Sequence, residues 1–135
     1  MKTYFADTNF YLRFLLNDNK DQAEKSASYL KKAKQQEIKI VFLSEVILEM
    51  GIVLEKFYKL KKPEIARHFS ILIKTAYLAI EDRSVWGESF AIFSKKNIDL
   101  LDVFLFVRAK TKGAEVLSYD KDFVRLAREF NEVNS

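Results

Sequence analysis

Cysteine is absent from the 135 residues, and proline and glycine are scarce, with one and three residues. Without cysteine the chain cannot form a disulfide framework, an iron–sulfur cluster, a thiolate zinc site or a cysteine nucleophile. The scarcity of glycine and proline excludes collagen-like and low-complexity chains, and it favours long regular elements joined by short turns. The lack of cysteine also agrees with a reducing, cytoplasmic setting.

Long hydrophobic runs are also missing. A stretch such as Val103 to Val107 is typical of the longest here, whereas a membrane-spanning helix needs about 20 apolar residues. The first residues reach a carboxylate at Asp7, which is too early for the hydrophobic stretch of a signal peptide. We therefore expect a soluble protein that does not enter a membrane.

The chain has the length and the apolar content of one domain. With 49% apolar and 14% aromatic residues and no internal repeat, residues 1–135 predict a single domain with a continuous core. The net charge is +4, and the segment Lys20 to Lys74 holds twelve Lys or Arg against seven Asp or Glu. Such a bias attracts polyanions such as nucleic acid, but a solvated lysine-rich helix face gives the same count. Taken alone, the charge favours the second interpretation.

Strand and helix patterns alternate along the chain. The expected strands are Thr3 to Ala6, Ile38 to Leu43, Tyr77 to Ile80 and Glu115 to Ser118. Helices are expected from Thr8, over Ala23 to Lys34, from Ser44 to about Leu60, over Ile65 to Ala76, from a cap at Ser84, over Leu100 to Thr111 after a cap at Asp99, and over Asp122 to Phe130. This order predicts an α/β fold with a central, mostly parallel sheet of four to five short strands and helices on both faces. The helix over Leu100 to Thr111 is apolar nearly all round, which predicts that it is buried.

Two aspartates directly follow expected strands. Asp7 follows Tyr-Phe-Ala, and Asp120 follows Val-Leu-Ser-Tyr. Ligands of open parallel sheets bind outside the carboxyl ends of the strands, so these carboxylates converge if their strands are neighbours. Either aspartate could instead cap the helix that follows, an interaction of about 1 kcal/mol. For each residue taken singly, capping is the better explanation.

Two further carboxylates lie within expected helices. Glu49 borders the apolar stripe of its helix, about 105° from the centre of the stripe at 100° per residue, although it could be a surface residue that pairs with a lysine. Asp102 lies in the most apolar helix, where an unpaired buried carboxylate costs several kcal/mol. Backbone N–H groups at the start of this helix offset part of that cost, because Asp102 is the third residue after Asp99. A metal cation or a lysine would have to offset the rest.

The donor set decides which ion could bind. Four carboxylates with one histidine, His68, and no cysteine form an oxygen site, which suits Mg²⁺ or Mn²⁺ rather than Zn²⁺ or copper. With one or two such ions bound, a carboxylate cluster orients water, lowers its pKa and stabilises the charge that develops on a phosphodiester. The residues therefore predict metal-dependent nuclease chemistry.

The ordered motifs resemble those of PIN domains, and most of all the VapC toxins. They are a strand before Asp7-Thr8-Asn9, then Ser44-Glu45-Val46-Ile47-Leu48-Glu49, Asp99-Leu100-Leu101-Asp102, and Val116-Leu117-Ser118-Tyr119-Asp120-Lys121-Asp122-Phe123. The resemblance covers almost the whole chain. It implies an endoribonuclease of a type II toxin–antitoxin pair that cleaves RNA with Mg²⁺ or Mn²⁺. It also implies a homodimer that a VapB-like antitoxin inactivates, in a heterotetramer or a larger complex.

The resemblance also implies the roles of single residues. The acidic quartet is Asp7, Glu49, Asp102 and Asp120; the supporting residues are Thr8, Asn9, Ser118 (where Thr is usual) and Asp122, the last being a second candidate for the fourth acidic ligand. In this interpretation the first three acids hold the principal ion, and Asp120 completes the site or supports a second ion. Val103 stands where a small Ala is common, which removes no carboxylate.

Three alternatives remain. A catalytically silent PIN-like module would bind RNA or a protein through the basic middle segment. A phosphoryl-accepting receiver domain fits less well, because it needs paired acids after the first strand and a late Lys-Pro, whereas Lys62-Pro63 lies in mid-chain. A phosphatase with an Asp-x-Asp loop fails in the same way at Asp7-Thr8-Asn9.

Overall fold

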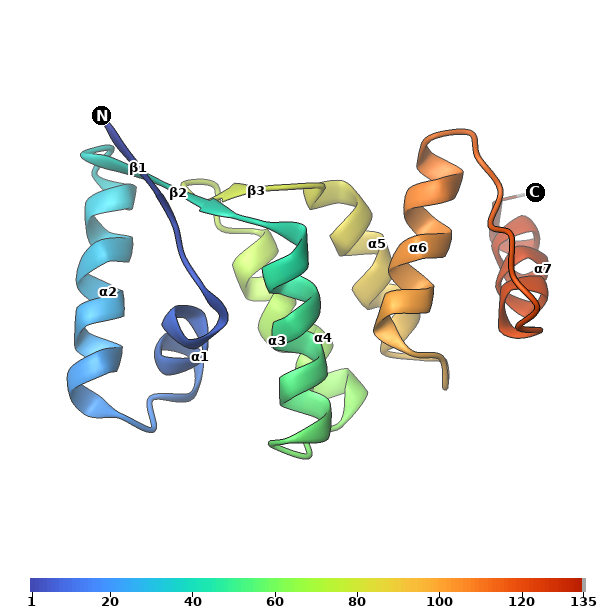
Figure 1. Ribbon diagram of the computed structural model, residues 1–135, viewed down its shortest axis with the longest axis horizontal. Helices are drawn as coiled ribbons and strands as arrows, with labels where there is room; N and C mark the ends of the chain where they lie inside the picture. Colours follow the sequence, from blue (N-terminus) through green and yellow to red (C-terminus); the bar gives the residue numbers. More distant parts are fainter. Residues whose placement is uncertain (135) are drawn as a thin grey trace.

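The protein is described by a computed structural model that covers residues 1–134, with side chains described up to Phe130. Strands and helices alternate in its first half, and helices dominate the second (Figure 1). The elements are β1 (Lys2–Phe5), α1 (Thr8–Leu16), α2 (Lys20–Lys34), β2 (Ile38–Phe42), α3 (Ser44–Lys56), α4 (Lys62–Ile73), β3 (Ala79–Ile80), α5 (Arg83–Phe93), α6 (Leu100–Thr111) and α7 (Asp122–Asn134).

The sheet is parallel, as expected, and has the strand order β1-β2-β3 in the described part of the chain. Its register pairs Lys2 with Ile38 at one end of β1 and Phe5 with Val41 at the other. The sheet has three strands rather than the expected four to five, because residues 115–118 do not form a strand. That segment has no strand partner, so its strand-like pattern alone does not produce a strand.

The elements follow one another along the long axis of the molecule (Figure 1). β1, α1 and α2 occupy one end, α3 and α4 lie in the middle, and α5 and α6 follow. α7 and the segment that leads into it lie at the other end, against α6. β1 is an edge strand of the sheet, and it lies far from the segment that leads into α7.

Several helix boundaries differ from the expected ones. α6 begins after the cap Asp99, as predicted. α3 begins at Ser44 but ends at Lys56 instead of about Leu60, because the turn beyond it places Lys59 in the left-handed conformation. The expected cap at Ser84 is wrong, since the N-cap of α5 is Asp82.

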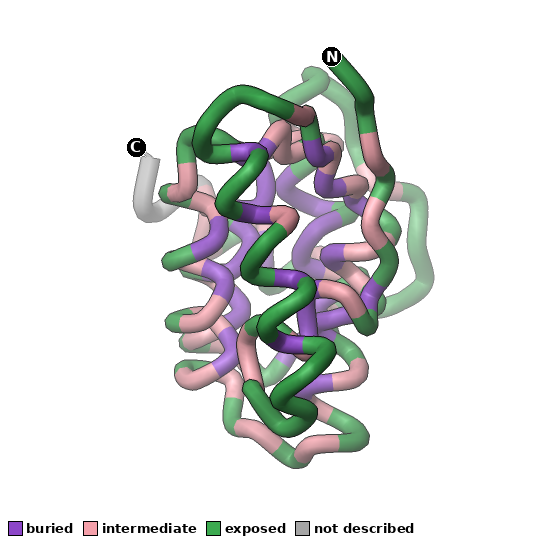
Figure 2. Tube along the Cα trace, turned by 90° about the vertical axis from the view of Figure 1, so that its left-hand side faces the viewer, coloured by how far each residue is buried: buried purple, intermediate pink, exposed green. Residues whose placement is uncertain are grey.

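Stacked aromatic rings join the elements of the core. Tyr11 of α1 stacks on Phe42 of β2 with ring centroids 3.8 Å apart, and Trp86 of α5 stacks on Phe104 of α6 at 3.9 Å. Figure 2 shows the buried residues running through the interior between the helices. α6 buries most of its apolar residues, as predicted, but Leu101 and Leu105 are exposed. No helix within residues 1–134 has the length and apolar character that crossing a membrane requires.

Candidate active site

Asp7 lies where β1 ends and α1 begins. Its Oδ1 accepts a hydrogen bond of 3.0 Å from the Phe10 N–H, so the carboxylate caps α1, and the side chain remains exposed. Thr8 is buried as the first residue of α1, whereas Asn9 is exposed. Asp7 and Asn9 line a cleft of about 200 Å³ between α1 and α2, together with Lys25. The capping interpretation of Asp7 is confirmed, and it leaves the second carboxylate oxygen available to a ligand.

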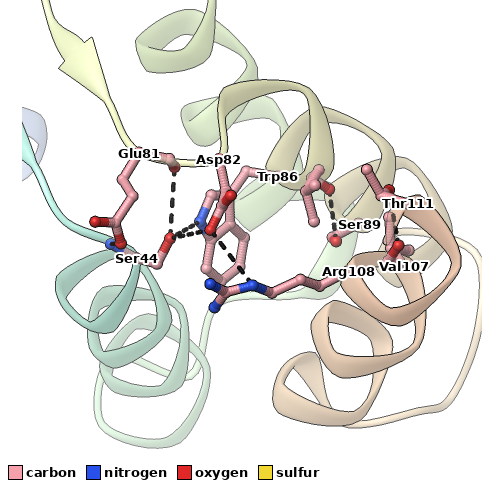
Figure 3. A network of polar contacts seen from close by, with 9 residues as sticks. Ser44, Glu81, Asp82, Trp86, Ser89, Val107, Arg108 and Thr111 are labelled. Carbon is pink, nitrogen blue, oxygen red and sulfur yellow. Dashed lines mark hydrogen bonds and ion pairs between the residues drawn. The ribbon is translucent and has the colours of Figure 1, made fainter. Parts of the chain in front are cut away.

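The helix that carries Glu49 is anchored at Ser44, where β2 ends (Figure 3). The Ser44 N–H donates to Glu81 Oε1 at 3.1 Å, and Trp86 Nε1 donates to Ser44 Oγ at 3.0 Å. The Ser44 hydroxyl lies 3.3 Å from Asp82 Oδ2, which can accept its proton. These contacts fix the start of α3 against the loop between β3 and α5. Glu49 itself is exposed.

Glu81 and Asp82 are carboxylates that the sequence analysis did not select. Both follow β3 directly, which is the same signal that singled out Asp7 and Asp120. Their roles in the structure are to position other groups: Glu81 binds the start of α3, and Asp82 forms an ion pair of 3.8 Å with Nε of Arg108 (Figure 3). A carboxylate that follows a strand can therefore hold neighbouring elements in place instead of binding a ligand.

A glycine allows α3 and α6 to approach closely. A Cβ atom built on Gly51 would lie 2.3 Å from Leu100 Cδ2, a distance that no larger residue can tolerate without a shift. Leu100 is the first residue of α6, so this contact fixes the start of α6 against α3. The absence of a side chain at Gly51 thus allows the helix that carries Glu49 to lie close to the start of the helix that carries Asp102.

Asp102 is the third residue of α6 and is half-buried. Burial raises the pKa of its carboxyl above the usual value, and the negative charges of Asp99, Asp120 and Asp122 raise it further. Within residues 1–130, where side chains are described, no ion pair neutralises Asp102. The carboxylate therefore lies in a negative environment that a cation would stabilise.

Asp120 and Asp122 form the turn into α7. The Asp120 N–H donates to Ser118 Oγ at 3.0 Å, and the Asp122 N–H donates to Asp120 Oδ1 at 2.9 Å. Asp122 also pairs with Arg125 at 3.6 Å. Asp120 thus stabilises the turn that precedes α7, which begins at Asp122, and Asp122 already has a cationic partner.

The structure brings some of the expected acids near one another but does not assemble the quartet. Asp120 and Asp122 are near enough to Asp102 to repel its charge. Asp7 precedes α1, which lies on the far side of α3 to α6 from α7 (Figure 1). Among the described residues, no group of three His, Cys, Asp or Glu side chains is placed to hold a metal ion. The oxygen donors suit Mg²⁺ or Mn²⁺, but their present positions form no complete site.

Comparison with known proteins identifies relatives over nearly the whole chain. The PIN domain family matches residues 4–129. A VapC ribonuclease of Aquifex aeolicus (strain VF5) is 27% identical over 129 residues, which cover 95% of this chain and 93% of that relative. No solved structure matches the chain significantly.

Proposed function

Because the chain belongs to the PIN-domain family, as a VapC-type member, we propose that it is a metal-dependent endoribonuclease toxin. It would hydrolyse RNA phosphodiester bonds with Mg²⁺ or Mn²⁺, and a VapB-like antitoxin would neutralise it. The observation that carries the proposal is the match over residues 4–129 together with a relative named as a VapC ribonuclease. The unneutralised carboxylate of Asp102 supports the metal requirement.

We assign the principal metal site to Asp7, Glu49 and Asp102, completed by Asp120, with Asp122 as the alternative fourth acid. Asp122 is the weaker candidate, because Arg125 already neutralises part of its charge. The assignment requires residues 118–120 to lie beside the end of β1, since the described arrangement leaves Asp7 apart from Asp120.

Each residue contributes a separate part of the chemistry. A bound divalent ion would supply an activated water and stabilise the charge that develops on the phosphodiester. Asp102 holds its negative charge at a helix N-terminus, where the backbone N–H groups partly offset it. Thr8 and Asn9 shape the first loop, and the Ser118 hydroxyl orients the backbone of Asp120. Lys25, which lines the cleft beside Asp7, is placed to attract an RNA phosphate.

Exposed apolar residues support protein partners. Ile52 and Phe57 of the α3 region are exposed, as are Leu101 and Leu105 of α6. Such residues fit the homodimer and the antitoxin contacts of the proposal, because apolar surface is stabilised when a partner covers it.

One observation favours a second candidate function. Among the described residues, no three carboxylates are placed to hold a metal ion, which is what a catalytically silent module that binds RNA or protein would show. Such a module needs only the basic surface, for example the exposed lysines in the last turn of α2.

An RNA cleavage assay separates the two functions. Total RNA is incubated with the protein in Mg²⁺, in Mn²⁺ and in a chelator, and the cut sites are mapped. We expect cleavage only with the ions, and its loss in Asp7→Asn and Asp102→Asn. Asp21→Asn, an exposed acid of α2, is the matched control and should cleave normally. Binding of RNA without ion-dependent cleavage would support the silent module, and full cleavage by both site variants would overturn the assignment.

A further inference from the structure

The cleft beside Asp7 has features that the metal site does not use. It lies between α1 and α2, which pack against each other at one end of the molecule (Figure 1). The Ser26 hydroxyl in the cleft donates to the Phe10 carbonyl at 2.9 Å and so ties α2 to α1 at this place. The volume of about 200 Å³ is below the range of about 300–1,000 Å³ that is usual for drug-sized ligands. The cleft therefore suits one flat group rather than a large ligand.

Aromatic rings form part of the cleft wall. Phe10 of α1 and Tyr29 of α2 both line it, and their ring centroids lie 6.3 Å apart at an interplanar angle of 72°. Tyr29 also contacts the ring of Tyr4 in β1, with centroids 5.6 Å apart. Phe10 and Tyr29 are half-buried, so their orientation is fixed while part of each ring remains accessible. Rings in such positions bind the unpaired bases of single-stranded RNA by stacking.

Two side-chain amides line the same cleft without a partner. The amides of Asn9 and Gln22 are exposed, and neither makes a hydrogen bond with a described residue. The backbone N–H of Gln22 is used by the cap Asn19, which fixes the place of Gln22 on α2. An amide offers a donor and an acceptor together, as the edges of nucleobases do. The cleft thus combines a surface for stacking with groups that can recognise the edge of a base.

The positive charge of the cleft is only partly neutralised. Arg13 donates to both carboxylate oxygens of Asp18, at 2.9 and 2.8 Å, so this cation is already paired. Lys25 is exposed and forms no ion pair with any described carboxylate. One uncompensated cation beside an aromatic wall favours a ligand that carries both negative charge and a flat ring.

The recognition groups of α2 lie on one face of that helix. Gln22, Lys25 and Tyr29 are spaced by three and four residues, so they are neighbours on the helix surface. Lys32 continues the face by three residues, and its Nζ lies 5.4 Å from the centroid of the Tyr29 ring. A lysine therefore lies on each side of the ring along the helix. A base stacked on Tyr29 would have its two flanking phosphates near these cations.

We propose that the cleft between α1 and α2 binds one unpaired base of single-stranded RNA. The base stacks on Tyr29, Asn9 and Gln22 hydrogen-bond its edge, and Lys25 and Lys32 hold the flanking phosphates. Duplex RNA does not fit, because its bases are already paired and stacked. Since Asp7 lines the same cleft, the bound base places a phosphate near the end of β1. The position of the base beside the cut rests on the function proposed above, whereas the binding of a base does not.

Photocrosslinking tests which part of the protein contacts the base. Single-stranded RNA of mixed sequence, with 5-bromouridine in place of uridine, is irradiated with the wild-type protein in a chelator, and mass spectrometry identifies the crosslinked residue. We expect the crosslink at Tyr29 or Phe10, and much less of it when the same RNA is annealed to its complement. Crosslinks only outside α1 and α2, no crosslink at all, or equal crosslinking of the duplex would overturn the proposal.

Affinities of variants test the stacking and the charge. Fluorescence anisotropy of labelled single-stranded RNA is measured in a chelator, after circular dichroism has shown that each variant is folded. Tyr29→Leu keeps an apolar side chain but removes the ring, so we expect at least about fivefold weaker binding. Lys25→Ala should also weaken binding and reduce the slope of log affinity against log salt by about 0.7.

Lys31→Ala is the matched control for Lys25→Ala. Lys31 is an exposed lysine of the same helix, about 120° around the helix from Lys25. Its loss should change the affinity by less than about twofold. Equal effects of the two lysine variants would overturn the contact of Lys25. Wild-type affinity in Tyr29→Leu would overturn the position of the base.

The base preference of cleavage tests the role of Gln22. Gln22 is exposed, so Gln22→Ala leaves the core intact. We expect the wild type to prefer certain bases at one position near the cut, and Gln22→Ala to lose part of this preference while it still cleaves. An unchanged preference would overturn the role of Gln22. A wild type that crosslinks at Tyr29 but cleaves no RNA would contradict the proposed function and leave the base site intact, and cleavage without that crosslink would do the reverse.

Discussion

Two similar stretches of sequence have different structures in this protein. Val41-Phe42-Leu43-Ser44 ends a strand and begins a helix, and its serine is buried in a network that includes Trp86. Val116-Leu117-Ser118 has a similar pattern but pairs with no described strand, and its Leu117 and Ser118 are exposed. The first stretch has strand neighbours on both sides, and the second has none. The difference shows that strand formation here depends on partners rather than on local preference.

The largest expected loss of stability comes from breaking the hydrogen-bond network around Ser44. Trp86→Ala removes the ring that stacks on Phe104 and the N–H that donates to Ser44. We expect the free energy of unfolding to fall by about 3–5 kcal/mol. Tyr119→Ala lies in the exposed segment before α7, so it should change the free energy of unfolding by less than about 0.5 kcal/mol. Urea unfolding followed by circular dichroism measures both. Equal losses would show that the two regions are equally well packed.

A smaller effect is expected at the contact between α3 and α6. Gly51→Ala forces its Cβ against Leu100, and we expect a loss of about 1–3 kcal/mol. Gly87→Ala is the matched control, because the nearest atom to its Cβ would be 3.9 Å away and alanine favours a helix over glycine. Thermal unfolding of both variants is the measurement. A neutral Gly51→Ala would mean that the Leu100 side chain shifts at little cost, and it would contradict a tight contact at this position.

A gain in stability is expected when Tyr11, in the core beside β2, loses its hydroxyl group. The Tyr11 hydroxyl is buried and has no hydrogen-bond partner among the described residues, and burial raises the pKa of Tyr11 above its usual value. Tyr11→Phe keeps the ring on Phe42 and removes the unsatisfied hydroxyl, so we expect a gain of about 1 kcal/mol. Tyr77→Phe, on the surface, should be neutral. A loss in Tyr11→Phe would contradict the absence of a partner.

The smallest expected effect is the pH dependence contributed by Asp102. Its pKa is raised in the folded protein, so the folded state binds more protons than the unfolded state between the ordinary value of 3.8 and the raised one. Stability therefore falls as pH rises through that window. Asp102→Asn should be more stable than the wild type above the window and equal to it below. An advantage for the variant that persists at low pH would contradict the assigned cause.

The sequence predicted those parts of the fold that local patterns determine. β1, β2 and the cap Asp99 were predicted correctly because apolar runs and capping residues mark them directly. The strand over Glu115 to Ser118 was wrong, because pairing depends on a neighbour that one segment cannot specify. The exposure of Leu101 was missed because composition cannot show which helix face lacks a partner.

The sequence selects candidate site residues but does not show whether they meet. The end of β1 marked Asp7, an expected strand that the structure does not form marked Asp120, and apolar surroundings marked Asp102, whose pKa is raised by burial and by nearby acids. The roles of Glu81 and Asp82 were not predicted. A position after a strand does not distinguish a carboxylate that binds a ligand from one that positions other residues. Whether carboxylates meet depends on how the strands pair, and the sequence does not encode that locally.

The central claim is that Asp120 joins Asp7 at one metal site. Titration calorimetry with Mn²⁺ tests it without requiring cleavage, using the wild type, Asp7→Asn, Asp120→Asn and the control Asp21→Asn. We expect both site variants to bind Mn²⁺ more than about tenfold more weakly, while the control is unchanged. Wild-type affinity in Asp120→Asn, with a loss only in Asp7→Asn, would contradict it.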